Sequence, residues 1–422
     1  MDIYDKLESN VRGYCRDFPV TFTTAINAKL TDDTGREYID FLGGAGTLNY
    51  GHNNPKFKQA LIDYIEKDGL THGLDMHSEA KTAFLESFEK HILKPRNLNY
   101  KVQFTGPTGT NAVEAALKIV RKNTGRHTVV SFTNAFHGVT QGSAAVTANG
   151  YYKEAIGMPL AGVQFMPYDG YLGDFNTLQY FEKALQGKSS GLGHPAAVIV
   201  ECIQGEGGLN AAQGAWLQGL QALCKRHKML LIVDDIQAGC GRSGTFFSFE
   251  EFGIKPDVIT LSKSLSGYGL PMAVVLMKPE LDTWKPGEHN GTFRGNNHAF
   301  ITARAAIETY WSNNSFSQEV KAKEKLIRGR LKEIQAQHGG KMKHKGRGIM
   351  QGLEFANGDI ASRITSLAFE KGLIIETSGS DGQVVKILTP LTIEVENLNK
   401  GLDILAQSVK TALTEQQTAA AS

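Results

Sequence analysis

The sequence lacks any long apolar run. Its most apolar stretches, such as Met229–Val233, are far shorter than the roughly 20 residues that a membrane-spanning helix needs. The first residues, MDIYDKLESNVRGYC, mix charges of both signs and contain no apolar core of the kind that marks a signal peptide. These absences argue against membrane insertion and secretion, and we expect a cytoplasmic protein.

Cysteine and net charge are also scarce. The four cysteines have neither CxxC nor zinc-ligand spacing, which predicts free thiols rather than a disulfide framework or a structural metal site. The 45 lysines and arginines nearly balance the 43 acidic residues, giving a formal net charge of +2. This balance gives no reason to expect a nucleic acid or another polyanion as partner.

What the chain does have, from about residue 100, is an alternation of short apolar runs with amphipathic helical stretches. The runs are KVQF (101–104), VVSF (129–132), AAVIVE (196–201), MLLIVD (229–234), DVITLS (257–262) and AVVLM (273–277). Helices are expected over 111–121 and 215–227. Fully apolar strands that alternate with helices predict an α/β fold with a mostly parallel central sheet covered on both faces.

The two ends of the chain have a different pattern of apolar and polar residues. Turn residues at 33–36 separate two strand-like stretches and predict a hairpin. After residue 315 we expect a long helix, the strands IMQGLEF, LIIET and VVKIL, and a last helix ending near Leu413. We therefore predict a large domain over 53–315 and a small α+β domain built from 316–422, which the N-terminal segment 1–52 joins.

Charged residues stand at the ends of three of the apolar runs. AAVIVE ends at Glu201, MLLIVD ends at Asp234, and Lys263 follows DVITLS. Ligands of open parallel sheets bind beyond the carboxyl ends of the strands, and a buried charge there is costly unless it is paired. A lysine and a carboxylate at this edge fit pyridoxal phosphate, with Lys263 bonded to its aldehyde and Asp234 facing its ring nitrogen. A solvated lysine and a helix-capping aspartate are the plainer alternatives.

Two further segments suit the same ligand. After KVQF, a glycine-rich turn with Gly109 and Thr110 opens a helix, and exposed amides at a helix start suit a phosphate dianion. Phe136 and His137 follow VVSF, where a flat aromatic ring can stack on the cofactor. His137 lacks partners at metal-ligand spacing, so we do not assign it to a metal.

Six segments together resemble a known family. GPTGTNAVEAALKIVR, AFHG, ECIQGEGG, VDDIQAGCGRSG, DVITLSKSLSGYGLPMA and GTFRGN are similar to motifs of the class III aminotransferases of fold type I, and they occur in that family's order. The resemblance covers roughly residues 20–395. It implies a large domain with a mostly parallel sheet, a small α+β domain, and pyridoxal 5′-phosphate as cofactor; it leaves a potassium requirement open.

The resemblance also implies roles for individual residues. Lys263 holds the cofactor covalently, Asp234 pairs with its ring nitrogen, Gln237 contacts its ring hydroxyl, and Phe136 stacks on its ring. The residues implied in cofactor binding are Gly109, Thr110, Phe136, His137, Glu201, Asp234, Gln237, Lys263 and Thr292. Thr292 reaches the phosphate in the neighbouring subunit, which implies a homodimer or a larger homo-oligomer.

Within the family, ESNVRGYCRDFP and GLDMHSEAK resemble the branch that transfers the amino group of glutamate to aspartate 4-semialdehyde in ectoine biosynthesis. Glu206 matches a carboxylate that gates the substrate pocket in relatives. Lys386 stands where relatives commonly carry an arginine that grips the substrate carboxylate, and lysine is a point charge rather than a planar fork. This departure leaves open how the carboxylate is held.

Three alternatives remain. The cofactor motifs do not separate this branch from 4-aminobutyrate, ornithine or acetylornithine aminotransferases. A nicotinamide-dependent oxidoreductase would rest on Gly205-Glu206-Gly207 after a strand, but it needs glycine where Asn210 stands and leaves Lys263 and Asp234 without a role. A non-catalytic regulatory protein is the third, and the sequence shows no DNA-binding module or basic arm for it.

Overall fold

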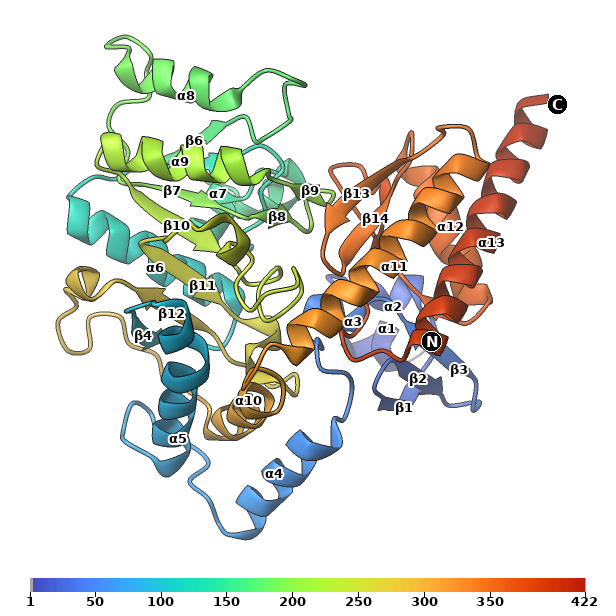
Figure 1. The fold of residues 1–422 in the computed structure, drawn as a ribbon, viewed down its shortest axis with the longest axis horizontal. Helices are drawn as coiled ribbons and strands as arrows, with labels where there is room; N and C mark the ends of the chain where they lie inside the picture. Colours follow the sequence, from blue (N-terminus) through green and yellow to red (C-terminus); the bar gives the residue numbers. More distant parts are fainter. Residues whose placement is uncertain (1–2, 422) are drawn as a thin grey trace.

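The computed structural model describes residues 3–421 and has two parts (Figure 1). One contains a large sheet with its helices, and the other contains the C-terminal helices together with the N-terminal strands. Both chain ends lie in this second part. The long helix α11 (Ser315–Gln337) begins next to the first part and runs along the second.

The central sheet has seven strands in the order β4-β12-β11-β10-β7-β5-β6. They are β4 (Lys101–Phe104), β5 (Val129–Phe132), β6 (Val163–Met166), β7 (Ala197–Val200), β10 (Leu230–Asp234), β11 (Val258–Leu261) and β12 (Val274–Met277). β12 runs antiparallel to both its neighbours, while the pairings from β11 to β6 are parallel. The predicted mostly parallel α/β sheet is confirmed. The edge strand β6 was not predicted.

Alternate side chains of each strand pack on opposite faces of this sheet, as the period of a strand requires. Ile232 packs in a cluster with α6 (Gly109–Thr124), whereas Leu231 and Val233 pack with residues of α5 (Glu79–Phe88), α9 (Gly214–Arg226) and α10 (Asn297–Tyr310). Burial on both faces explains why these strands are apolar throughout.

Several further helices and turns belong to the first half of the chain. They are α1 (Ile3–Leu7), α2 (Tyr14–Asp17), the turn α3 (Gly43–Gly46), α4 (Pro55–Glu66), α7 (Gln141–Val146) and α8 (Thr177–Gln186). Pro55 at the first position of α4 and the Asn54 side chain, which accepts a hydrogen bond from Lys56 N, fix where this helix begins.

Segments from both ends of the chain share the second part. The N-terminal strands β1 (Phe22–Ile26), β2 (Lys29–Asp32) and β3 (Glu37–Asp40) form an antiparallel meander, and β15 (Leu373–Ile374) pairs in parallel with β3. The hairpin predicted at 33–36 is the turn between β2 and β3.

A second four-stranded sheet has the order β13-β14-β17-β16. It comprises β13 (Lys343–Arg347), β14 (Met350–Glu354), β16 (Glu376–Ser378) and β17 (Val384–Ile387), flanked by α12 (Gly358–Glu370) and α13 (Val395–Ala421). β13 was not predicted. The predicted end of the last helix near Leu413 is wrong, because α13 continues to Ala421.

Within residues 3–421, no helix combines the length and the apolar character that crossing a membrane would require.

Candidate active site

A cavity of about 180 Å³ lies at the carboxyl ends of β7, β10 and β11. Its lining includes nearly all of the residues singled out in the sequence: Gly109, Thr110, Phe136, His137, Glu201, Glu206, Asp234, Gln237 and Lys263. The three strand-end charges at 201, 234 and 263 therefore meet at one place. Lys386 contacts the cavity only through Glu206, and Thr292 does not line it.

Lys263 begins the turn after β11 in a left-handed backbone conformation, with a φ of +48°. This conformation costs a lysine about 1–2 kcal/mol, and such strain persists where the surrounding structure imposes it, often at functional sites. Its Nζ donates a hydrogen bond to the carbonyl oxygen of Ala45 at 2.8 Å. Burial lowers the pKa of Lys263 despite the opposing effect of Glu206. The amine is thus closer to its neutral, nucleophilic form than a surface lysine is.

The carbonyl that receives Lys263 belongs to a left-handed turn formed by α3. Gly43, Gly44, Ala45 and Gly46 all have positive φ angles. A side chain at Gly43 would also overlap the carbonyl oxygen of Leu388. These requirements explain why glycine occupies three of the four positions of this turn. Gln237 Nε2 donates to the same Ala45 oxygen at 3.1 Å, so the turn connects Lys263 with Gln237.

Asp234 is buried at the end of β10, and both its carboxylate oxygens are held. Oδ1 accepts hydrogen bonds from Thr260 Oγ1 at 2.9 Å and from the Ile236 amide at 3.2 Å. Oδ2 lies 2.7 Å from Nδ1 of His137, a fully buried ring. Asp234 thus has a fixed orientation before any ligand binds.

Glu201 follows β7 and is held differently. Its Oε2 accepts a hydrogen bond from the Phe136 amide at 3.1 Å. Burial, reinforced by the neighbouring charge of Asp234, raises the pKa of Glu201 well above its ordinary value. The protonated form avoids placing two negative charges side by side at the sheet edge.

The other end of the cavity is formed by the start of α6. Among residues 3–421, the structure shows no protein acceptor for the amides of Gly109 and Thr110, which are orphan donors of the first helical turn. Thr110 Oγ1 lies 2.5 Å from Ser143 Oγ and 2.8 Å from Thr140 Oγ1. Gly138 covers these hydroxyls with a φ of +122°, and a Cβ there would lie 2.6 Å from Thr110 Oγ1.

A chain of charges continues from the cavity into the sheet of the second part. Gln237 Nε2 donates to Glu206 Oε1 at 3.0 Å, and Lys386 Nζ donates to the same oxygen at 2.9 Å. Lys386 Nζ also lies 3.1 Å from Glu376 Oε1, and Tyr14 donates to Glu376 Oε2 at 3.3 Å. The cavity is thereby connected to the N-terminal segment.

The charges of this chain shift one another. Burial alone would raise the pKa of Glu206, but the ammonium groups of Lys386 and Lys263 hold it below its ordinary value. Burial raises the pKa of Glu376, and Lys386 only partly offsets the effect. The pKa of Lys386 is raised, because its two carboxylate partners outweigh its burial. The two carboxylates therefore favour the charged form of Lys386.

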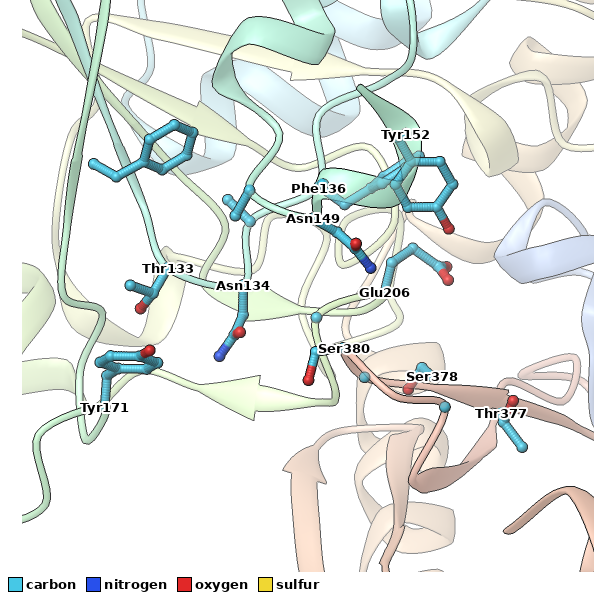
Figure 2. Close-up of a pocket in the computed structure, with 17 residues that line it drawn as sticks. Thr133, Asn134, Phe136, Asn149, Tyr152, Tyr171, Glu206, Thr377, Ser378 and Ser380 are labelled. Carbon is cyan, nitrogen blue, oxygen red and sulfur yellow. The ribbon is translucent and has the colours of Figure 1, made fainter. Parts of the chain in front are cut away.

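A second, larger cavity of about 570 Å³ adjoins the first, and Glu206 lines both. Figure 2 shows Thr377, Ser378 and Ser380 of the second part on one side of it, and Asn134 and Tyr171 of the first part on the other. Glu206 thus stands where the smaller cavity meets the wider one.

Thr292 lies elsewhere, in an exposed turn. Arg294 of the same turn forms an ion pair with Asp75, and the ring of Phe293 meets that of His72 edge to face at 5.4 Å. These two contacts hold the two segments together, and Thr292 is not among the residues that line the cavity.

Three parts of the site were missed in the sequence: the Ala45 carbonyl, Glu376 and Tyr14. A backbone carbonyl leaves no side-chain signal. Glu376 ends the apolar run LIIET much as Glu201 ends AAVIVE, so the strand-end argument applied to the second sheet would have found it. Tyr14 lies within ESNVRGYCRDFP, a segment noted for resemblance alone.

The comparisons with known proteins agree with this geometry. The family model "Aminotransferase class-III" matches residues 13–409. The chain belongs to the class III aminotransferases. This aminotransferase is 57% identical to a diaminobutyrate–2-oxoglutarate transaminase of Bordetella parapertussis over 100% of the chain and 97% of that protein. It is 59% identical to the protein of the same name from Halomonas elongata over 98% and 99%, respectively.

Solved structures agree on the fold of the aminotransferase. An ornithine aminotransferase from Toxoplasma gondii superposes with a TM-score of 0.85 at 25% sequence identity, over 98% of this chain and 94% of that one. The enzyme therefore has the fold type I architecture of pyridoxal phosphate-dependent aminotransferases.

Pyridoxal phosphate is the cofactor of this family, and the cavity fits it. The cavity offers a buried amine for the aldehyde, a buried and oriented carboxylate for a protonated ring nitrogen, and free helix-start amides for a phosphate. As an aminotransferase, the protein acts on amino acid and oxo acid substrates.

Proposed function

We propose that this aminotransferase moves the amino group of L-glutamate to L-aspartate 4-semialdehyde, giving L-2,4-diaminobutyrate and 2-oxoglutarate. The observation that carries this proposal is the 57–59% identity, over nearly the whole chain, to proteins named diaminobutyrate–2-oxoglutarate transaminase. The buried lysine and carboxylate in one cavity support it, because transamination needs both.

In this proposal Lys263 bonds to the cofactor aldehyde and Asp234 holds the ring nitrogen protonated. An opposite charge at hydrogen-bond range favours the protonated nitrogen by about 1.4–4 kcal/mol. Phe136 packs against the ring and Gln237 approaches its hydroxyl. These roles account for the way the fold orients Asp234 from both sides.

Two further residues of the cavity take part in holding the cofactor. His137 fixes the carboxylate of Asp234, and Glu201 lies beside Asp234 at the sheet edge. The phosphate is bound by Gly109 and Thr110, whose amides lack protein acceptors in the described chain.

The proton transfer of the reaction is assigned to Lys263. Bound pyridoxal phosphate supplies an electron sink for the carbon that loses its proton. The Lys263 amine would carry that proton as general base and acid. Its lowered pKa, caused by burial, favours the neutral base. The two substrates use the site in turn, in a ping-pong order.

Glu206 is the proposed gate of the substrate pocket. It pairs with Lys386 in the structure and lines both cavities. We infer that this pair stays closed for the semialdehyde, which presents its distal carbon, and opens for glutamate, which brings a second carboxylate. Glu206→Ala is expected to change the rates of the two half-reactions unequally, and equal effects on both would contradict the gate.

The position of Thr292 supports an oligomeric form of the enzyme. Because the residue is exposed and away from the cavity of its own chain, we propose that it binds the cofactor phosphate in the neighbouring subunit of a homodimer. The Asp75–Arg294 ion pair steadies the turn that carries it.

A panel of amino acceptors tests the proposed function. With glutamate as donor, the purified enzyme is given aspartate 4-semialdehyde, succinate semialdehyde or N-acetylglutamate 5-semialdehyde, and 2-oxoglutarate is measured. The proposal requires the highest kcat/KM with aspartate 4-semialdehyde. A higher value with either of the other acceptors would refute it in favour of a 4-aminobutyrate or acetylornithine aminotransferase.

A further inference from the structure

Lys386 is held by two carboxylates that differ in how they are fixed. Glu376 on β16 stands directly opposite Lys386 on β17 in the antiparallel ladder, so the sheet itself sets their separation of 3.1 Å. Glu206 belongs instead to the loop between the two-residue strands β8 (Ile203–Gln204) and β9 (Asn210–Ala211). One partner of Lys386 is part of a sheet and the other is part of a loop.

The same three groups differ in their access to the pocket. The side chain of Lys386 is 0% exposed and that of Glu376 is 9% exposed, whereas that of Glu206 is 25% exposed and lines both cavities. Glu206 therefore covers Lys386 on the pocket side. A movement of Glu206 uncovers the ammonium group but leaves Glu376 in place behind it.

We propose that Glu376 is a specificity-determining residue: it keeps Lys386 partly neutralised after Glu206 has moved away, so that a substrate carboxylate meets a paired lysine rather than a free cation. Glu376 does this from behind Lys386, as a positioning residue without contact to the substrate. The inference rests on the proposed function in so far as it takes a dicarboxylate, glutamate or 2-oxoglutarate, as one substrate.

The proposed reaction gives a reason for such a device. One pocket must accept glutamate, with two carboxylates, and 2,4-diaminobutyrate, with two amino groups and one carboxylate. An unpaired cation would attract the first and repel the second ammonium group of the other. A lysine whose carboxylate partner is fixed in the sheet reduces both effects and suits a pocket that serves both compounds.

The test measures the binding of a dicarboxylate that cannot react. Glutarate has the two carboxylates of 2-oxoglutarate but neither an amino nor a keto group, and its Kd for the holoenzyme is obtained by titration calorimetry. Glu376→Gln removes the counter-charge and keeps the shape of the side chain. Glutarate is expected to bind this variant about tenfold more tightly than the wild type, since Lys386 gains free charge. Glutaramide, which is uncharged, is expected to show no change.

Glu354→Gln is the matched control. Glu354 lies on β14 of the same sheet and pairs with Lys345 at 3.5 Å, so its replacement removes the same charge without freeing Lys386. It should leave the glutarate Kd unchanged. An unchanged Kd in Glu376→Gln, or equal tightening in both variants, would overturn the proposal.

Glu376→Asp keeps the test decisive if Glu376→Gln does not fold. It retains the charge but withdraws it from Lys386 by one methylene, and an intermediate Kd is expected; a wild-type Kd in folded Glu376→Asp would overturn the proposal. A different result would refute the proposed function. Lack of turnover with aspartate 4-semialdehyde would refute that assignment, while tighter glutarate binding would still support the role of Glu376.

Discussion

Nδ1 of His137 lies 2.7 Å from Oδ2 of Asp234, and the imidazole has no exposed side-chain surface. Its other ring nitrogen, Nε2, is buried without a hydrogen-bond partner in the described chain. Burying a ring nitrogen without a hydrogen-bond partner costs free energy of folding. We therefore infer that the role of His137 is its contact with Asp234. Together with Thr260, the histidine leaves Asp234 one orientation.

His137→Ala should weaken cofactor binding because Asp234 loses one of its fixed partners. A hydrogen bond to a charged group contributes about 1.5–3 kcal/mol, so the Kd for pyridoxal phosphate should rise at least about tenfold. Absorbance titration of the apoenzyme measures this change. His137→Asn, which keeps a donor near the position of Nδ1, should recover part of the affinity, and replacement of the exposed His127 by alanine should change nothing. Equal loss in the alanine and asparagine variants would argue against an orienting role.

Gly138→Ala should damage the phosphate end of the site. The residue has a φ of +122°, and its Cβ would lie 2.6 Å from Thr110 Oγ1 and 2.7 Å from Ser143 Oγ. Strain and crowding together should cost about 2–3 kcal/mol of cofactor binding or stability. Gly329→Ala, on α11 with open space around it, should instead be neutral or stabilise by about 0.5–1 kcal/mol. Thermal unfolding of the apo and holo forms measures both, and an unaffected Gly138→Ala would contradict the description of this end.

Asp235 makes stability depend on pH. Burial raises the pKa of its carboxyl to about 7, above the ordinary value of 3.8. Between these values the folded state holds a proton that the unfolded state has lost, so the contribution of this group to stability falls as pH rises from 4 to 7. Asp235→Asn, which mimics the protonated acid, should therefore be more stable relative to the wild type at pH 8 than at pH 5, by about 1–2 kcal/mol. Urea unfolding at both pH values measures this, and a difference of the opposite sign would show that Asp235 is ionised when folded.

The sequence was most informative where a local pattern follows directly from the fold. Strands buried on both faces must be apolar throughout, so the runs that became β7, β10 and β11 were recognisable. Two of the missed strands, β6 and β13, are edge strands. In β6 only Met166 is buried, and β13 reads KHKGR, as suits an edge that must resist further pairing. Neither pattern resembles a buried strand.

The residues of the site also divide into those that a local sequence pattern predicts and those that it does not. Glu201, Asp234 and Lys263 were predictable because parallel strands bring their carboxyl ends to one edge. The contact between Glu376 and Lys386 depends on the register of β16 with β17. The contact between Lys263 and Ala45 depends on a turn that lies 218 residues away in the sequence. Such long-range relationships leave no spacing to read in one sequence.

The covalent attachment of the cofactor to Lys263 is the central claim, and reductive trapping tests it most directly. Borohydride reduction of the holoenzyme, followed by tryptic digestion and mass spectrometry, should find the reduced cofactor on the peptide that contains Lys263. Lys263→Ala should lose both this label and the visible absorbance of the holoenzyme, along with turnover. A label on any other lysine, or full turnover by folded Lys263→Ala, would contradict the account.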